Sequence, residues 1–260
     1  MTGGAFAFAE LLELKNDRRA RDGLGLALVE GVRFVMRAAE RPTALVGLVL
    51  ANKLLDSAAA RRLLRETTVP VMRVGAEEFR RLSIAPTPQG IAAVVRQEVR
   101  TLADGAVKSR VWACLESVRS PGNLGTIART CEAAGAGLML LGDELDPYDP
   151  QVMRASMGSL LAIRKVRATA AELRAWKRER SATIVGASAD ARRDFRTLTG
   201  ARPLVLMIGC ERRGMSATQR GLCDTLVRIP MVGGLDSLNV AVAAGLLLYE
   251  TYRARWPLGG

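Results

Sequence analysis

The sequence predicts an α/β protein of two units, and three observations support this prediction. Apolar strand-like runs alternate with amphipathic helical segments along most of the 260 residues. The alternation stops at a polar, charged stretch over 101–109 and then restarts. Several later runs are almost continuously apolar, which is typical of parallel strands that helices cover on both faces. We therefore expect one unit over 1–100, a linker over 101–109 and a second unit over 110–260.

The first unit contains four strand-like runs with helical segments between them. The helix over 56–66 opens with Asp56 and Ser57, whose side chains are good N-terminal caps. Such regular alternation is typical of a compact α/β unit of about one hundred residues. The expected strands are 24–30, 44–51, 69–74 and 89–97, and the expected helices are 32–40, 56–66 and 76–83.

The second unit repeats the alternation and ends in the most apolar helix of the chain, over 240–249. Two glycines and several polar residues precede this helix, and Asp236 or Ser237 would serve as its cap. The near-continuous apolar runs favour a parallel sheet. The expected strands are 111–118, 137–143, 182–188, 202–211 and 225–231, and the other expected helices are 122–136, 149–159 and 171–181.

The composition narrows the possible chemistry. The chain has 38 Lys and Arg and a formal net charge of +12, which favours an anionic partner, first of all a nucleic acid. It contains no histidine, so a Ser-His pair, a Cys-His pair or a histidine base is excluded. None of the four cysteines forms a CxxC pair, and we expect no metal site. Aromatic residues are only 4%, which argues against a base-stacking platform.

The chain also lacks the sequence signals of a membrane protein. No apolar stretch approaches the roughly 18 residues that a membrane-spanning helix needs. The first residues are amphipathic and do not follow the order of a secretory signal peptide. We therefore expect no membrane association and a cytoplasmic location.

Three strand ends carry unusual polar residues, in the region where an open α/β sheet holds its ligands. In the segment 120–130, Asn123 can cap a helix and Arg129 follows six residues later, at a helix end that attracts phosphate. In the segment 206–215, Gly209 allows a ligand close to the backbone and Glu211 could be a base, a ribose ligand or an arginine partner. The third end carries Ser237 and Asn239, which could cap the last helix and face a ligand.

Each segment taken alone also has a simpler interpretation. Asn123 with Arg129 could be a cap and a solvated charge, and Glu211 could be an exposed carboxylate in a turn. No phosphate-binding loop of the GxxxxGK[ST] type and no GxGxxG is present, so a nicotinamide-dependent enzyme is poorly supported.

Together and in this order, the three segments resemble the SpoU/TrmH family of RNA 2′-O-ribose methyltransferases, within the SPOUT superfamily. The resemblance covers roughly 107–255. A weaker resemblance links "LVEGVR" and "TPQGIAAVVRQ" to the L30e-like RNA-binding domain of rRNA-directed members. The family's motifs correspond here to Asn123, Gly125 and Arg129; to Gly209, Glu211 and Gly214; and to Ile229-Pro230-Met231 with Ser237-Leu238-Asn239-Val240.

The resemblance implies an L30e-like α/β domain followed by a SPOUT α/β domain with a parallel sheet and a C-terminal trefoil knot. It implies that S-adenosylmethionine binds in the knot and that no metal is needed. It further implies a homodimer, with Arg154 meeting RNA phosphate. The implied catalytic residues are Asn123, Arg129, Glu211, Ser237 and Asn239, and the implied cofactor-binding residues are Ala187, Gly209, Ile229, Met231 and Leu238.

The implied reaction is methyl transfer from S-adenosylmethionine to a ribose 2′-oxygen of RNA, most consistent with 23S ribosomal RNA. Arg129 would bind the neighbouring phosphate and position the hydroxyl, because a guanidinium is too basic to act easily as a proton acceptor. Asn123 would hold Arg129, and Glu211 would pair with Arg129 or with the substrate. A tRNA 2′-O-methyltransferase and a catalytically silent RNA-binding protein remain as alternatives. A role in resistance to ribosome-targeting antibiotics is also open.

Overall fold

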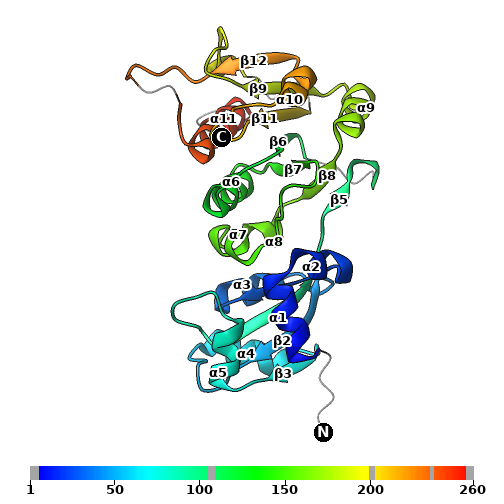
Figure 1. Ribbon diagram of the computed structural model, residues 1–260, viewed down its shortest axis with the longest axis vertical. Coiled ribbons are helices and arrows are strands. Elements are labelled where there is room, and N and C mark those ends of the chain that lie inside the picture. The colour runs from blue at the N-terminus through cyan, green and yellow to red at the C-terminus, as the bar shows by residue number, and fades with distance from the viewer. Residues whose placement is uncertain (1–5, 105–108, 199–202, 235–236, 256–260) are drawn as a thin grey trace. The chain divides into compact units, whose positions relative to one another are not determined.

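The computed structural model describes residues 6–104, 109–198, 203–234 and 237–255 (Figure 1). The chain forms two compact units. Unit 1 comprises Met1–Glu98 and Asp146–Ala162, and unit 2 comprises Val99–Leu145 and Ile163–Gly260. Residues 105–108 of the expected linker lie outside the described residues.

Unit 1 is built on a four-stranded sheet in the order β1-β4-β2-β3. β4 runs antiparallel to both of its neighbours, whereas β2 and β3 are parallel. On one face of the sheet, Leu14 of α1 and Phe79 of α5 are buried in a common apolar cluster with Leu28. The elements are β1 (Leu26–Glu30), β2 (Leu45–Leu50), β3 (Val71–Arg73), β4 (Ile91–Arg96), α1 (Phe8–Asn16), α2 (Arg18–Leu24), α3 (Val32–Ala39), α4 (Ala58–Glu66) and α5 (Ala76–Leu82).

The segment Asp146–Ala162 belongs to unit 1 although it follows β7 in the chain. It contains α7 (Pro150–Ala155) and α8 (Ser159–Ala162). The nearly buried Arg21 guanidinium forms an ion pair with Asp146 at 2.5 Å, and the Tyr148 hydroxyl accepts a hydrogen bond from the Glu98 backbone N–H at 2.6 Å. The expected division of the chain into 1–100 and 110–260 did not include this segment in the first unit.

Unit 2 is built on an eight-stranded sheet in the order β10-β12-β9-β11-β6-β7-β8-β5, and all of its strand pairs are parallel. Every residue of the three central strands β11, β6 and β7 is buried, as the continuous apolar runs predict. The strands are β5 (Arg100–Thr101), β6 (Val111–Leu115), β7 (Gly137–Leu141), β8 (Lys165–Ala168), β9 (Thr183–Ala187), β10 (Arg193–Asp194), β11 (Leu204–Ile208) and β12 (Thr225–Arg228).

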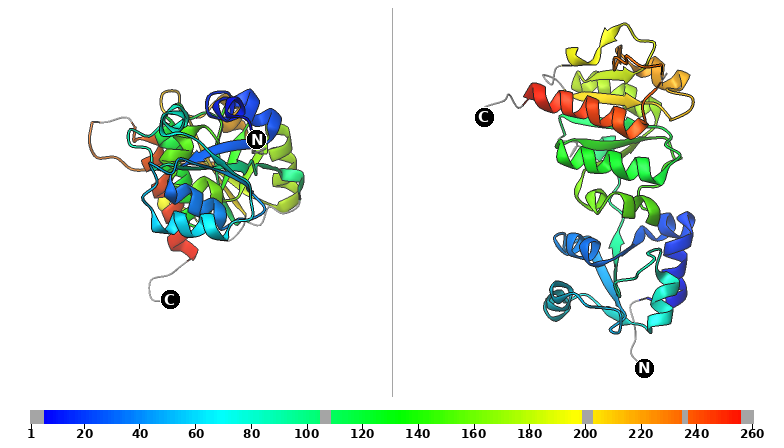
Figure 2. Two further views of the ribbon diagram at one scale, coloured as in Figure 1. Left: turned by 90° about the horizontal axis from the view of Figure 1, so that it is seen from below. Right: turned by 90° about the vertical axis from the view of Figure 1, so that its left-hand side faces the viewer.

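Helices cover both faces of this sheet (Figures 1 and 2). α6 and α11 lie side by side on one face, while α9 and α10 cover the other, where Trp112 and Trp176 share an apolar cluster. This arrangement places the starts of α6 and α11 near the ends of β6 and β11. The remaining elements are α6 (Pro121–Ala133), α9 (Ala170–Arg180), α10 (Ala217–Leu222), α11 (Val240–Arg255) and the short 3-10 turns η1 (Leu102–Asp104) and η2 (Phe195–Thr197).

The structure corrects three local expectations. Arg100 and Thr101 pair in parallel with Val166 and Arg167, so the last residue of the expected first unit and the first residue of the expected linker form the edge strand β5. Asn239 caps α11, because its side-chain oxygen accepts hydrogen bonds from Ala241 N at 2.8 Å and Val242 N at 3.3 Å. The expected cap at Ser237 is therefore wrong, and the other expected cap, Asp236, lies outside the described residues. The expected cap at Asn123 is wrong as well, because Ser120 is the N-cap of α6 and Asn123 lies in its first turn.

Candidate active site

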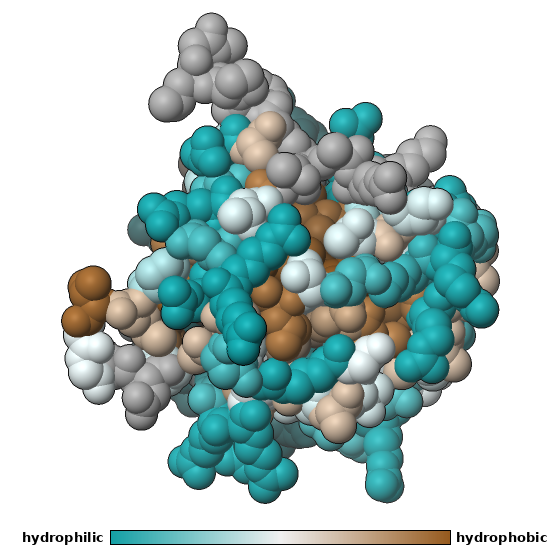
Figure 3. All heavy atoms as spheres, turned by 90° about the horizontal axis from the view of Figure 1, so that it is seen from above, coloured by the Kyte–Doolittle hydropathy of each residue, from teal (hydrophilic) through white to brown (hydrophobic). Residues whose placement is uncertain are grey.

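A cavity of about 450 Å³ in unit 2 lies where β9, β11 and β12 end. One part of its lining is apolar, and another part carries charged side chains. Figure 3 looks onto unit 2 from the β12 side and shows apolar atoms exposed between polar side chains. The cavity is lined by Ala187, Ser188, Ala189, Asp190, Ile208, Gly209, Cys210, Glu211, Arg212, Gly214, Arg220, Val227, Ile229, Met231, Ser237, Leu238, Val240 and Ala243.

The structure brings together the five residues that the resemblance assigns to the cofactor. Ala187 ends β9, Gly209 follows β11, and Ile229 and Met231 follow β12. Leu238 lies just before α11 and is 37% exposed. These positions come from four separate segments of the sequence, so only the fold makes them neighbours.

Gly209 has a structural role that the sequence does not reveal. A Cβ atom at this position would lie 2.2 Å from the carbonyl carbon of Gly214 and 2.3 Å from the backbone nitrogen of Met215. The chain folds back on itself here, with Cys210 and Gly214 joined by two backbone hydrogen bonds of 2.9 and 3.0 Å. The close approach that requires glycine is therefore within the chain itself, whereas the sequence suggested only the approach of a ligand.

Glu211 joins the cavity to the start of α6. Its carboxylate accepts a hydrogen bond of 2.8 Å from Nδ2 of Asn123 and one of 3.2 Å from the Arg119 backbone N–H. Partial burial would raise the pKa of Glu211, but these hydrogen bonds to the ionised form outweigh burial and lower it. A carboxylate that is held in this way is a poor proton acceptor and a good anchor.

Asn123 continues this connection to α11. Its side-chain oxygen accepts a hydrogen bond of 3.1 Å from Nδ2 of Asn239, the residue that caps α11. The chain of hydrogen bonds Glu211–Asn123–Asn239 thus connects the end of β11, the start of α6 and the start of α11. We call it the amide network.

Arg129 lies outside the amide network. It is exposed on α6, and it has no hydrogen-bond or ion-pair partner among the described residues. The expected contact between Asn123 and Arg129 is absent, because six residues of an α-helix turn through about 600°, which places the two side chains roughly 120° apart around the axis. Ser237 is also exposed and lines the cavity.

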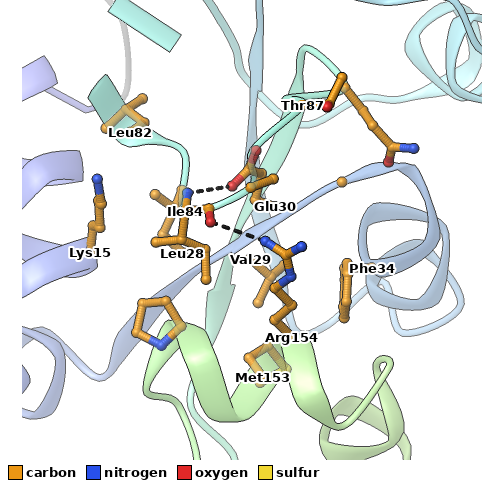
Figure 4. A pocket seen from close by; sticks show the side chains of 14 residues that line it. Lys15, Leu28, Val29, Glu30, Phe34, Leu82, Ile84, Thr87, Met153 and Arg154 are labelled. Carbon is orange, nitrogen blue, oxygen red and sulfur yellow. Dashed lines mark hydrogen bonds between the residues drawn. The ribbon is translucent and has the colours of Figure 1, made fainter. Parts of the chain in front are cut away.

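Arg154, the expected RNA contact, lies in unit 1 at a second cavity of about 230 Å³ (Figure 4). Its Nη1 donates a hydrogen bond of 3.0 Å to the carbonyl oxygen of Ile84, whose backbone N–H in turn donates to Glu30 at 3.0 Å. Lys15 and Phe34 also line this cavity. The site therefore has charged and aromatic groups but takes no part in the cavity of unit 2.

Several lining residues were missed by the sequence analysis. Ser188 could have been found, because it is the last residue of the expected strand 182–188. Arg220 could not, because the short helix α10 that carries it was not expected. Cys210 also lines the cavity, and hydrogen bonds from the backbone N–H groups of Arg213 and Arg212 lower the pKa of its thiol.

Within the described residues, no group of three or more Cys, Asp or Glu side chains could hold a metal ion.

Two family models match the chain. The model of the SpoU rRNA Methylase family covers residues 110–249, which includes the whole cavity of unit 2. The model of the MRM3-like substrate binding domain covers residues 10–93.

Known proteins that resemble the chain agree with these matches. The 23S rRNA (uridine(2479)-2′-O)-methyltransferase of Streptomyces viridochromogenes is 33% identical over 257 residues, covering 95% of this chain and 90% of that protein. The putative TrmH family tRNA/rRNA methyltransferase YacO of Bacillus subtilis is 43% identical over 148 residues, covering 56% of this chain and 59% of that protein.

Solved structures show the same likeness. The SpoU methyltransferase AviRb from S. viridochromogenes, in complex with the cofactor AdoMet, matches with a TM-score of 0.87 and 32% identity over 95% of this chain and 97% of that chain. A putative RNA methyltransferase of the TrmH family from Porphyromonas gingivalis matches with a TM-score of 0.80 and 26% identity, covering 96% and 97%.

The parallel sheet, the cavity at its strand ends and these matches define an RNA methyltransferase. The chain belongs to the SpoU rRNA methylase family, whose model spans more than half of it.

Proposed function

We propose that this chain transfers a methyl group from S-adenosylmethionine to a ribose 2′-oxygen of 23S ribosomal RNA. The observation that carries the proposal is the cavity of unit 2, which the amide network joins to the start of α6. A relative of nearly full length is named as a 23S rRNA 2′-O-methyltransferase, and a similar structure contains AdoMet. The basic composition fits an RNA substrate.

The cavity suits S-adenosylmethionine in size and chemistry. Its volume of about 450 Å³ falls within the range of small-molecule sites. Ile229, Met231 and Leu238 offer apolar surface for an adenine ring, and the backbone at Gly209 is open to a ligand. When bound, the cofactor supplies an activated methyl group on a sulfonium.

In the proposed reaction, each residue of the site has a role in binding or positioning the substrate. The ribose 2′-oxygen attacks the methyl carbon, the bond from that carbon to sulfur breaks, and the hydroxyl proton passes to solvent. Arg129 binds the neighbouring phosphate, because its exposed guanidinium offers a planar set of donors. Glu211 fixes Asn123, and Asn239 fixes the start of α11, so the amide network keeps the two edges of the cavity in place. Ser237 completes the edge toward the substrate.

We further propose that the enzyme is a homodimer formed through α11. Val242, Leu246 and Tyr249 are 52%, 40% and 50% exposed and recur at helical spacing, so they form one apolar stripe. α6, which carries Arg129, packs beside α11 on the same face of the sheet. A second subunit on this stripe would approach both the cavity edge and Arg129.

Unit 1 supports the choice of a ribosomal substrate. It matches a substrate-binding domain model, and Arg154 at its cavity is our candidate for a phosphate contact. We place the enzyme in the cytoplasm, where ribosomal RNA would be its substrate. No helix among the described residues is both long and apolar enough to cross a membrane.

Methylation of purified ribosomal RNA tests this function. The enzyme and radiolabelled S-adenosylmethionine should label 23S rRNA at a 2′-O position, which then resists alkaline cleavage. The same assay with tRNA should give little label. Labelling of tRNA alone, or of bases in place of ribose, would overturn the proposal.

A further inference from the structure

The cavity of unit 2 has a charged end to which the proposed function assigns no role. Ser188 and Asp190 lie in the segment after β9, and Arg220 lies in α10. All three side chains line the cavity. The apolar residues Ile229 and Leu238 come from other segments, so the lining divides into an apolar part and a charged part.

The three side chains form one hydrogen-bonded group. Nη2 of Arg220 donates to the Ser188 hydroxyl oxygen at 2.9 Å, and that hydroxyl donates to the Asp190 carboxylate. The second terminal nitrogen of Arg220 lies 3.5 Å from the other carboxylate oxygen of Asp190. Ser188 therefore sets the spacing of a negative and a positive group on one wall.

This group contributes little to the stability of the fold, because both charges are open to solvent. The side chains of Arg220 and Asp190 are 40% and 69% exposed, and exposed ion pairs are weak. The hydrogen bond from Ser188 lowers the pKa of Asp190, which stays ionised at neutral pH. Both charges thus keep free hydrogen-bonding capacity toward the cavity.

We propose that Asp190 and Arg220 form the subsite for the amino-acid part of S-adenosylmethionine. This inference rests on the proposed function. The amino-acid part is a zwitterion, with an ammonium and a carboxylate on one carbon atom. Asp190 accepts hydrogen bonds from the ammonium, and Arg220 donates to the carboxylate with its planar guanidinium. Ser188 is a positioning residue that keeps the two charges at a matching separation.

The subsite explains how one small cavity can hold a ligand with two unlike ends. Ile229 and Leu238 favour the adenine ring, whereas Asp190 and Arg220 favour the charged tail. With both ends held, the sulfonium between them has few free orientations, which favours one direction of methyl transfer.

Four ligands separate the possible contacts in a binding experiment with the full chain. S-adenosylmethionine and S-adenosylhomocysteine both carry the zwitterion, but only the first carries the sulfonium charge. Decarboxylated S-adenosylmethionine keeps the ammonium and lacks the carboxylate. Methylthioadenosine keeps adenine and ribose and lacks the amino-acid part. Calorimetry gives a Kd for each ligand.

We expect Asp190→Asn to raise the Kd for S-adenosylmethionine, S-adenosylhomocysteine and the decarboxylated ligand by about tenfold or more. The Kd for methylthioadenosine should stay unchanged. We expect Arg220→Gln to raise the Kd only for the two ligands that carry the carboxylate, S-adenosylmethionine and S-adenosylhomocysteine. The matched controls are Asp194→Asn and Arg196→Gln, which break an ion pair of 2.7 Å between two residues that do not line the cavity. These controls should bind all four ligands as the wild type does.

Other outcomes overturn the inference. If Asp190→Asn weakened the binding of S-adenosylmethionine and of its decarboxylated form, the two ligands with a sulfonium, and left S-adenosylhomocysteine unchanged, the carboxylate would face the sulfonium. Equal weakening of all four ligands would show an effect on the whole pocket, and unchanged affinities with weaker RNA binding in Arg220→Gln would make Arg220 an RNA contact. If the wild type bound none of the four ligands, the proposed function itself would fail.

Discussion

The Asn123 side-chain amide donates a hydrogen bond of 2.8 Å to the Glu211 carboxylate, joining residues that are 88 positions apart in the chain. Asn123 lies in the first turn of α6, and Glu211 follows β11 at the cavity. Asn239 extends the contact to α11 at 3.1 Å. The three motif residues thus act together on the geometry of the site, and none of these contacts is local in sequence.

Replacing Glu211 with Gln tests whether this carboxylate anchors the site. The pKa of Glu211 is lowered in the folded chain, so the ionised form stabilises the fold above the ordinary glutamate pKa, and this stabilisation disappears as the pH falls through the lower folded value. Glu211→Gln should lower the free energy of unfolding at pH 7 by about 1 kcal/mol. The difference from the wild type should vanish in acid.

Urea unfolding at several pH values measures this effect. Glu172→Gln is a suitable control, since Glu172 also has a lowered pKa but lies in the capping box of α9. Glu172→Gln should have a smaller effect on stability, because this carboxylate is exposed to solvent, and only Glu211→Gln should slow methyl transfer. Loss of activity in both variants would point to general destabilisation.

Arg129→Ala should reduce methyl transfer roughly a hundredfold or more and leave the Kd for S-adenosylmethionine unchanged, because Arg129 does not line the cavity. Arg129→Lys should restore little, since an ammonium cannot replace a planar set of donors. Arg174→Ala, at an exposed position on α9, is the control. Single-turnover methylation is the measurement.

The pH dependence of the remaining Arg129→Ala activity separates two roles. If Arg129 positions the phosphate, RNA docking should weaken and the pH profile should keep its shape. If Arg129 accepts the proton, RNA affinity should survive and the residual rate should rise with pH. Normal turnover in Arg129→Ala would remove Arg129 from the mechanism.

The sequence predicts the parallel sheet of unit 2 well, because buried strands such as β6 and β11 are continuously apolar. It fails at β8, where Lys165 interrupts the apolar pattern although the residue is only 3% exposed. The motifs identify the lining of the cavity, but not the partners of Asn123, because hydrogen bonds between distant segments leave no periodic pattern. The trefoil knot and the roles of the site residues stay predictions.

Gly209→Ala should destabilise unit 2 by roughly 1–3 kcal/mol, since the new methyl group would overlap the backbone of Gly214 and Met215. The displaced turn would also weaken binding of S-adenosylmethionine. Gly221→Ala is the matched control, because a Cβ atom there meets nothing within 4 Å and alanine favours the helix α10. Thermal unfolding and calorimetry should show a loss for the first variant only.

Val242→Glu should convert the proposed dimer into a monomer, because a charge in an apolar interface loses its hydration without gaining a partner. Sedimentation equilibrium gives the mass of the assembly. The control is Leu24→Glu, at an exposed leucine of unit 1 (53% exposed). A wild-type chain that sediments as a monomer at micromolar concentration would contradict the interface on α11.

Arg154→Gln should weaken binding to rRNA and leave the Kd for S-adenosylmethionine unchanged, because Arg154 lies at the cavity of unit 1. Loss of one phosphate contact should reduce the slope of log Kd against log salt by about one. Arg62→Gln is the control, since Arg62 is exposed but already paired with Glu66 at 2.8 Å. If Arg154 served only to hold the segment at Ile84 through its 3.0 Å hydrogen bond, the melting temperature would fall while the salt slope stayed constant. That result would assign Arg154 to the fold of unit 1 and remove it from the RNA-binding surface.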